Sequence, residues 1–129
     1  MKEQEIATNI GKSGCLALCY IRLAQIKLNS EYRSPLAILA DNYNSLLNKG
    51  IIDEDCYINN AENFIRHIFN IDTRISKETE NPKNGSVIAY NGKHFVIVDE
   101  NDEIVWNSLD NDRAWYNLPI KSYRTMRII

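Results

Sequence analysis

The sequence has no long apolar run, and this absence excludes a membrane-spanning protein. None of its 129 residues belong to a stretch that approaches the roughly 18 apolar residues of a transmembrane helix. The start, MKEQEIATNI, also lacks the apolar region and the small-residue cleavage site of a secretory signal peptide. We therefore expect a protein that is neither exported nor membrane-bound and that lies in the cytoplasm.

The sequence also lacks an excess of one charge. Fifteen Lys and Arg residues stand against seventeen Asp and Glu residues, for a formal net charge of −2. No block of like charges resembles the basic segments that follow a phosphate backbone. Nucleic acid is therefore not an expected partner.

Cysteine and histidine are scarce. The three cysteines, Cys15, Cys19 and Cys56, are an odd number without metal-ligand spacing, which does not suit a disulfide framework. We interpret them as thiols in a reducing compartment. Cys15 and Cys19 lie four residues apart on one helix face, but with only two histidines in the chain a zinc site is not expected. The sequence predicts no metal and no cofactor.

The apolar residues of the first half recur at helical spacing. This spacing predicts helices over residues 15–29, over 35–49, and over a short segment after Asn59-Asn60. Ser34 is a suitable N-cap for the second helix, with proline at the first helical position. Residues 1–12 are polar and are expected to form a lead-in segment.

After residue 70 the pattern changes to alternation. Strands are expected near Ile71–Ile75 and over 86–90, 93–99, 103–107 and 120–129, with an irregular loop over 108–118. Asn91-Gly92 is a favoured two-residue hairpin turn, so the three middle strands should form an antiparallel meander.

Helices followed by strands indicate an α+β domain. The length and the 44% hydrophobic content suit a single domain over residues 1–129. Its helical half, about 13–70, should pack against a twisted antiparallel sheet formed by about 71–129.

Cys15 is the first candidate catalytic residue. A cysteine in the first turn of a helix lies near unpaired backbone N–H groups and the positive end of the helix dipole, which favour the thiolate. The pattern therefore predicts a nucleophile. The alternative is a small apolar residue on the core face.

His94 and Asn107 are the second and third candidates. His94 begins an apolar strand directly after a tight turn, and Asn107 ends the next strand. Neighbouring strands lie about 4.8 Å apart, so the Asn107 carboxamide can accept a hydrogen bond from the imidazole and select its tautomer. The alternatives are an exposed strand histidine and an ordinary turn asparagine.

The order of these residues resembles the papain-like cysteine peptidase superfamily, in a compact form most similar to the double-glycine leader peptidases. The resemblance implies a papain-like fold, with Cys15 as nucleophile, His94 as proton carrier and Asn107 as orienting residue. Superfamily members place an amide six residues before the nucleophile in the oxyanion hole. That residue is Asn9 here, where the family usually has glutamine. Asp110 is the reserve for the orienting role of Asn107.

A broader resemblance is to small uncharacterised proteins of phages and bacterial mobile elements. In those proteins a Gly-Cys helix, a segment like residues 49–57 and a His-Phe strand recur. This resemblance implies no established activity.

Three functions follow as hypotheses. The first is a small cysteine peptidase or amide hydrolase that cleaves a peptide or isopeptide bond through Cys15, His94 and Asn107. The second is a catalytically inactive papain-like scaffold that binds a protein partner, for instance a phage or mobile-element inhibitor of a host protein. The third is a thiol-dependent transferase. In the first two hypotheses, the expected partner is a peptide or a protein.

Overall fold

The computed structural model describes residues 12–108, 115 and 118–129. Within them the chain forms three helices followed by strands, in the order predicted. The helices are α2 (Lys12–Leu28), α3 (Pro35–Asn48) and α4 (Ala61–Phe69). The lead-in segment lies outside the described residues except for Lys12, at which α2 begins. This start is three residues before the predicted one, so Cys15 is the fourth residue of α2.

The predicted helix starts agree with the observed caps. Ser34 caps α3, and its hydroxyl accepts a hydrogen bond from the backbone N–H of Ala37 at 3.4 Å. Asn60 caps α4 in the same way, with its carboxamide oxygen 3.0 Å from the N–H of Asn63. These local hydrogen bonds explain why both helices begin where the sequence predicts.

The second half of the chain forms one five-stranded sheet, in which each strand runs antiparallel to its neighbours. Its strands are β1 (Thr73–Glu78), β2 (Val87–Tyr90), β3 (Phe95–Val98), β4 (Ile104–Trp106) and β5 (Ser122–Ile128). The predicted meander is present as β2, β3 and β4. The order across the sheet is β1-β5-β2-β3-β4, so the last strand lies between the first two.

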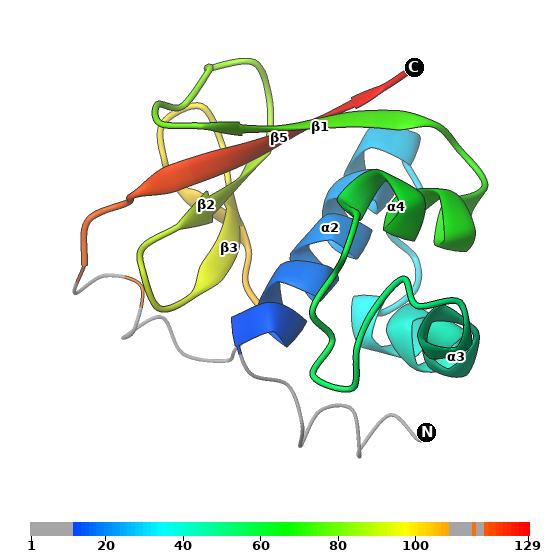
Figure 1. The fold of residues 1–129 in the computed structure, drawn as a ribbon. Helices are drawn as coiled ribbons and strands as arrows, with labels where there is room; N and C mark the ends of the chain where they lie inside the picture. Colours follow the sequence, from blue (N-terminus) through cyan, green and yellow to red (C-terminus); the bar gives the residue numbers. More distant parts are fainter. Residues whose placement is uncertain (1–11, 109–114, 116–117) are drawn as a thin grey trace.

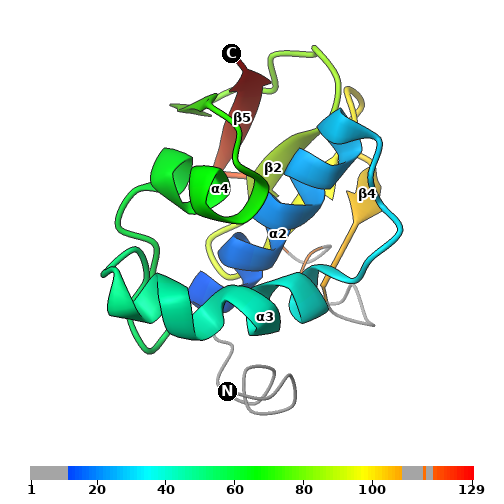
Figure 2. The same cartoon turned by 90° about the vertical axis from the view of Figure 1, so that its right-hand side faces the viewer.

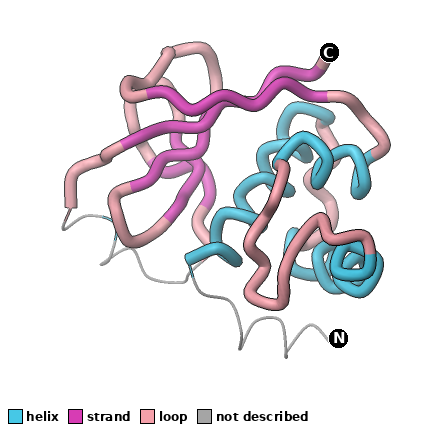
Figure 3. Tube along the Cα trace, viewed as in Figure 1, coloured by secondary structure: helices cyan, strands magenta, loops and turns pink. Residues whose placement is uncertain are grey.

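The helices lie together on one side of the sheet (Figures 1 and 3). Helix α2 is at the centre of the fold, and Figure 2 shows α4 and β4 on opposite sides of it. Most of its side chains are buried between α3, α4 and the sheet, as the broad apolar surface predicts. A second buried cluster, which includes Val96 and Trp115, covers the other face of the sheet. In the described part of the chain, no helix has the length and apolarity needed to cross a membrane.

The turn between β2 and β3 differs from the prediction by one residue. Its central residues are Gly92 and Lys93 rather than Asn91 and Gly92, because the Asn91 N–H bonds the His94 carbonyl at 3.3 Å. The side chain of Asn91 closes the other half of the turn by accepting the His94 N–H at 2.9 Å. Asn91 thus acts through its carboxamide, and Gly92 takes the positive φ of 96°.

Candidate active site

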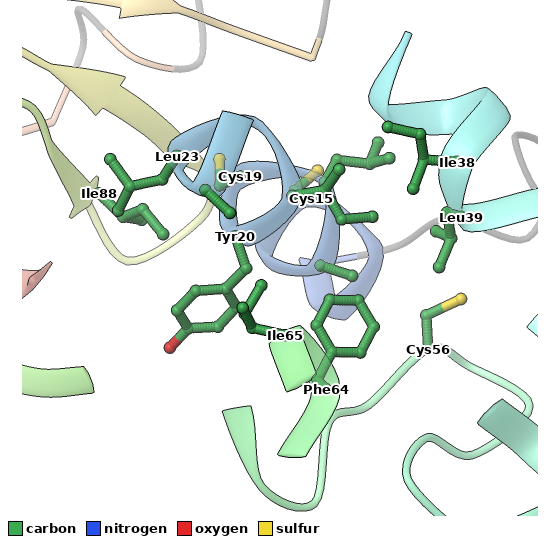
Figure 4. Close-up of a cluster of buried hydrophobic side chains, with 14 of the residues drawn as sticks. Cys15, Cys19, Tyr20, Leu23, Ile38, Leu39, Cys56, Phe64, Ile65 and Ile88 are labelled. Carbon is green, nitrogen blue, oxygen red and sulfur yellow. The ribbon is translucent and has the colours of Figure 1, made fainter. Parts of the chain in front are cut away.

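Cys15 lies on the side of α2 that faces Trp106 of β4 and Ser108, which follows two residues later. Cys15, Cys19 and Arg22 share one helix face, and Figure 4 shows the sulfur atoms of Cys15 and Cys19 on the same side of α2. At the far end of this face, the Arg22 guanidinium lies 5.5 Å from the centre of the Trp106 ring. At the near end, the Ser108 hydroxyl lies beside the Cys15 thiol. Helix α2 therefore runs antiparallel to the segment from Trp106 to Ser108.

His94 and Asn107 are joined by a short hydrogen bond. The ring nitrogen Nε2 of His94 lies 2.6 Å from the carboxamide oxygen of Asn107. That oxygen can only accept a hydrogen bond, so Nε2 carries the proton and Nδ1 is the basic nitrogen of the neutral ring. His94 is only 4% exposed, so the buried ring keeps this orientation.

Asn91 fixes the backbone that carries His94. Its side-chain oxygen accepts hydrogen bonds from the N–H groups of Lys93 at 3.0 Å and of His94 at 2.9 Å. Its side-chain nitrogen donates to the Trp115 carbonyl at 3.3 Å. Asn91 is fully buried, so these bonds are protected from water. This role was not predicted, although an asparagine three residues before a candidate histidine is a signal for it.

Two of the predicted residues, His94 and Asn107, are in direct contact, and Cys15 is connected to them through Ser108. The Cys15 thiol lies beside Ser108, which follows Asn107 in the chain, and Asn107 is hydrogen-bonded to His94. The structure therefore brings the start of α2 beside Ser108, and the turn before β3 beside the residue that follows β4. Asn9 and Asp110 lie outside the described residues.

The electrostatic environment of Cys15 differs from the prediction. Burial raises the pKa of the Cys15 thiol above its ordinary value, while the Ser108 hydroxyl and the backbone N–H of Cys15 lower it by smaller amounts. The prediction of a net lowered pKa is wrong, because loss of water around the sulfur outweighs the N–H groups of the helix start.

Ser108 is the second residue whose role the sequence analysis missed. Its buried hydroxyl lies close enough to the thiol to favour the anion, yet it makes no hydrogen bond of ordinary geometry among the described residues. It is therefore free to turn its proton toward a thiolate at position 15.

The other two cysteines are worse nucleophiles. Cys19 is fully buried, which raises its pKa well above the ordinary value, and the nearby Cys15 raises it further. Burial, with the carboxylates of Asp53 and Asp55, raises the pKa of Cys56 to about 11. All three cysteines are free thiols, and of them only Cys15 has a neighbouring hydroxyl that lowers its pKa.

Comparison with known proteins assigns the chain to a family. The profile of a family described as proteins of unknown function, DUF261, matches residues 1–128. The chain therefore belongs to the DUF261 family. No curated protein and no solved structure matches the chain significantly.

Proposed function

We propose that this protein is a papain-like cysteine hydrolase that cleaves a peptide or isopeptide bond. The observation that carries the proposal is the part-buried hydrogen bond between His94 and Asn107, whose chain neighbour Ser108 lies beside the Cys15 thiol. A neutral imidazole with its proton held on Nε2 presents Nδ1 as a base. That is the arrangement that activates a cysteine.

The topology supports the same proposal. The candidate nucleophile stands near the start of a central buried helix, the candidate base directly precedes a strand that packs on that helix, and the candidate orienting amide directly follows the next strand. This order along the chain is the one in which the papain-like superfamily carries its site. A papain-like fold is therefore part of the proposal.

Each site residue has its own role in the proposed reaction. His94 Nδ1 takes the thiol proton of Cys15, and the thiolate attacks the substrate carbonyl. The backbone N–H of Cys15 donates to the oxyanion, a contribution of about 3–4 kcal/mol in enzymes where a single donor has been removed. The imidazolium then gives its proton to the leaving amine, and water hydrolyses the resulting thioester. The positive charge on His94 offsets the desolvation that otherwise raises the thiol pKa.

A second candidate function is binding without catalysis. It is favoured by the burial of Cys15, which is 6% exposed and whose pKa is raised rather than lowered. In this case the site is a closed polar cluster in a scaffold that binds a protein partner. The two candidates differ in what they predict for the reactivity of the thiol.

The test is the rate at which iodoacetamide labels Cys15, followed by mass spectrometry between pH 5 and 10. A thiolate paired with His94 reacts below pH 8 and faster than Cys19 or Cys56. The variant His94→Ala then loses this reactivity. His67 provides the matched control, because it is the other histidine of the chain and its Nε2 also bonds a side-chain oxygen, that of Ser45, at 2.7 Å.

The outcomes separate the candidates. Labelling of Cys15 that falls in His94→Ala and persists in His67→Ala supports the hydrolase. Labelling that rises only at alkaline pH, and is equal in both variants, contradicts it. Under the binding function, Cys15→Ala retains the biological effect and pulls down the same partner from the native host.

A further inference from the structure

A cavity of about 460 Å³ lies on the side of α2 that bears Leu16 and Tyr20. Two of its lining residues, Leu16 and Phe95, directly follow Cys15 and His94 in the chain. The remaining lining residues come from the segment before α4, from the first residue of α4, and from β2 and β5. They are Tyr57, Ile58, Ala61, Tyr90 and Arg124. The volume is in the range of pockets that hold small ligands or single side chains.

Arg124 is the unusual member of this lining. On β5 the residues that alternate with it toward α2 are Ser122 and Met126, both buried, so Arg124 occupies an inward position of the sheet. Directly opposite it on the flanking strands are Ile88 on β2 and Lys77 on β1. Neither neighbour is an acid that neutralises the guanidinium.

The guanidinium is held in place, but one of its nitrogens has no acceptor. Its central carbon lies 4.8 Å from the centre of the Phe95 ring, and Phe95 stacks in turn on Tyr90 with ring centres 4.3 Å apart. Nη1 of Arg124 is buried and has no hydrogen-bond partner in the part of the chain that the structure describes. Buried donors of this kind are costly and are usually paired. This one lacks an acceptor, and a small shift of the Arg124 side chain is needed to present it to a ligand in the cavity.

Tyr20 supplies a second donor in the same cavity. Tyr20 is 4% exposed and burial raises its pKa to about 12, while the charge of Arg124 and a side-chain hydrogen bond with Arg124 oppose the rise. The phenol therefore stays protonated under ordinary conditions and can donate a hydrogen bond. The cavity thus combines one fixed cation and one neutral donor with apolar and aromatic walls.

We propose that this cavity binds a carboxylate group carried on an apolar or aromatic ligand. A guanidinium accepts a carboxylate through two parallel hydrogen bonds, and the aromatic walls cover the rest of the ligand. Arg124 is the only cation among the lining residues, so the charge in the cavity matches a monoanion better than a phosphate dianion. The carboxylate can belong to the free end of a peptide or to an acidic side chain.

This inference concerns binding and does not depend on catalysis by Cys15. A ligand in the cavity nevertheless lies next to the residues that follow Cys15 and His94 in the chain. If the proposed hydrolase is correct, the cavity selects substrates with a carboxylate close to the scissile bond.

The test uses the full chain with Cys15→Ala, so that no probe is cleaved, and measures dissociation constants by NMR titration. One pair of probes is acetyl-alanyl-phenylalanine with a free carboxylate and the same dipeptide as its carboxamide. The other pair is acetyl-phenylalanyl-glutamate amide and its glutamine analogue, which places the carboxylate on a side chain. The carboxylate probe that binds more tightly shows whether the cavity prefers the free end of a peptide or an acidic side chain.

We expect a carboxylate probe to bind at least about tenfold more tightly than its neutral partner. Arg124→Met keeps the apolar length of the side chain and abolishes this preference, and Tyr20→Phe reduces it. Arg127→Met, on the same strand and exposed, is the matched control and retains it. Thermal unfolding verifies that each variant is folded. Equal binding of charged and neutral probes, no binding of any probe, or an unchanged preference in Arg124→Met overturns the inference.

Discussion

Nε2 of His94 lies 2.6 Å from Oδ1 of Asn107, across the strand pair β3 and β4. Both residues lie just outside the regular strands, where side chains do not have to point to one face of the sheet or the other. The hydrogen bond therefore fixes a ring that the backbone alone leaves free to rotate. It also determines which ring nitrogen is basic.

The first prediction concerns Asn107. Asn107→Leu removes the acceptor and leaves the buried Nε2–H unsatisfied, which costs about 1–3 kcal/mol of unfolding free energy. The neutral ring then loses its preference for the Nε2–H tautomer, as seen in the nitrogen chemical shifts of His94. Asn107→Asp keeps an acceptor oxygen and should keep the tautomer. An unchanged tautomer in Asn107→Leu would falsify the orienting role.

The second prediction concerns Asn91, which acts through His94. Asn91→Ala removes two accepted hydrogen bonds and one donated bond in a fully buried position, and it should cost about 2–3 kcal/mol of unfolding free energy in urea. Under the proposed mechanism it also slows iodoacetamide labelling of Cys15, because the histidine backbone loses its anchor.

The substitution Asn91→Asp separates the loss of stability from the loss of the backbone anchor of His94. It retains the oxygen that accepts the His94 N–H and loses only the donor to the Trp115 carbonyl. We expect lower stability but near-normal labelling of Cys15. If both substitutions lower stability equally and neither changes labelling, Asn91 has no positioning role.

The features that the sequence predicted correctly are those set by nearby residues. The Ser34 and Asn60 caps depend on hydrogen bonds that span three residues. The approach of Asn107 to His94 follows from a short connection between adjacent strands. By contrast, the insertion of β5 between β1 and β2 is a pairing of distant segments, and local alternation carries no information about which strands pair.

Cys15 also combines a local feature that the sequence predicts with a long-range effect that it does not. Its position near the start of a helix could be read from the sequence, and helix starts favour thiolates. Its burial was expected only as the alternative to a reactive thiol, and how far it outweighs the helix start depends on the packing of α2 against the helices and the sheet. That burial reverses the direction of the pKa shift. The Ser108 hydroxyl, which opposes the burial, reaches Cys15 through the same long-range packing.

The third prediction concerns Ser108. Since its hydroxyl lowers the pKa of the Cys15 thiol, Ser108→Ala should move the pH midpoint of iodoacetamide labelling upward. Stability should change by less than about 1 kcal/mol, because the Oγ makes no other hydrogen bond among the described residues. Ser45→Ala, in the exposed pair with His67, is the control and should leave the midpoint unchanged. A midpoint that stays in place in Ser108→Ala argues against contact between hydroxyl and thiol.

The last prediction concerns stability at alkaline pH. Burial raises the pKa of Cys56 from 9.0 to about 11 and raises the pKa of Cys19 as well. Above pH 9 the unfolded chain loses these protons before the folded chain does. The free energy of unfolding must therefore fall as the pH rises, by at most about 1.4 kcal/mol per pH unit and per thiol.

Below pH 9 both states keep their thiol protons, so this contribution is constant there. Urea unfolding at pH 7, 9, 10 and 11 measures the fall, and Cys56→Ala should make it shallower between pH 9 and 11, because one of the groups responsible is gone. Tyr20 and Tyr123, whose pKa values rise from 10.0 to about 12, add to the decline from about pH 10 upward in both proteins. A slope that is identical with and without Cys56 would mean that this thiol is exposed to water in the folded protein, contrary to its 2% exposure.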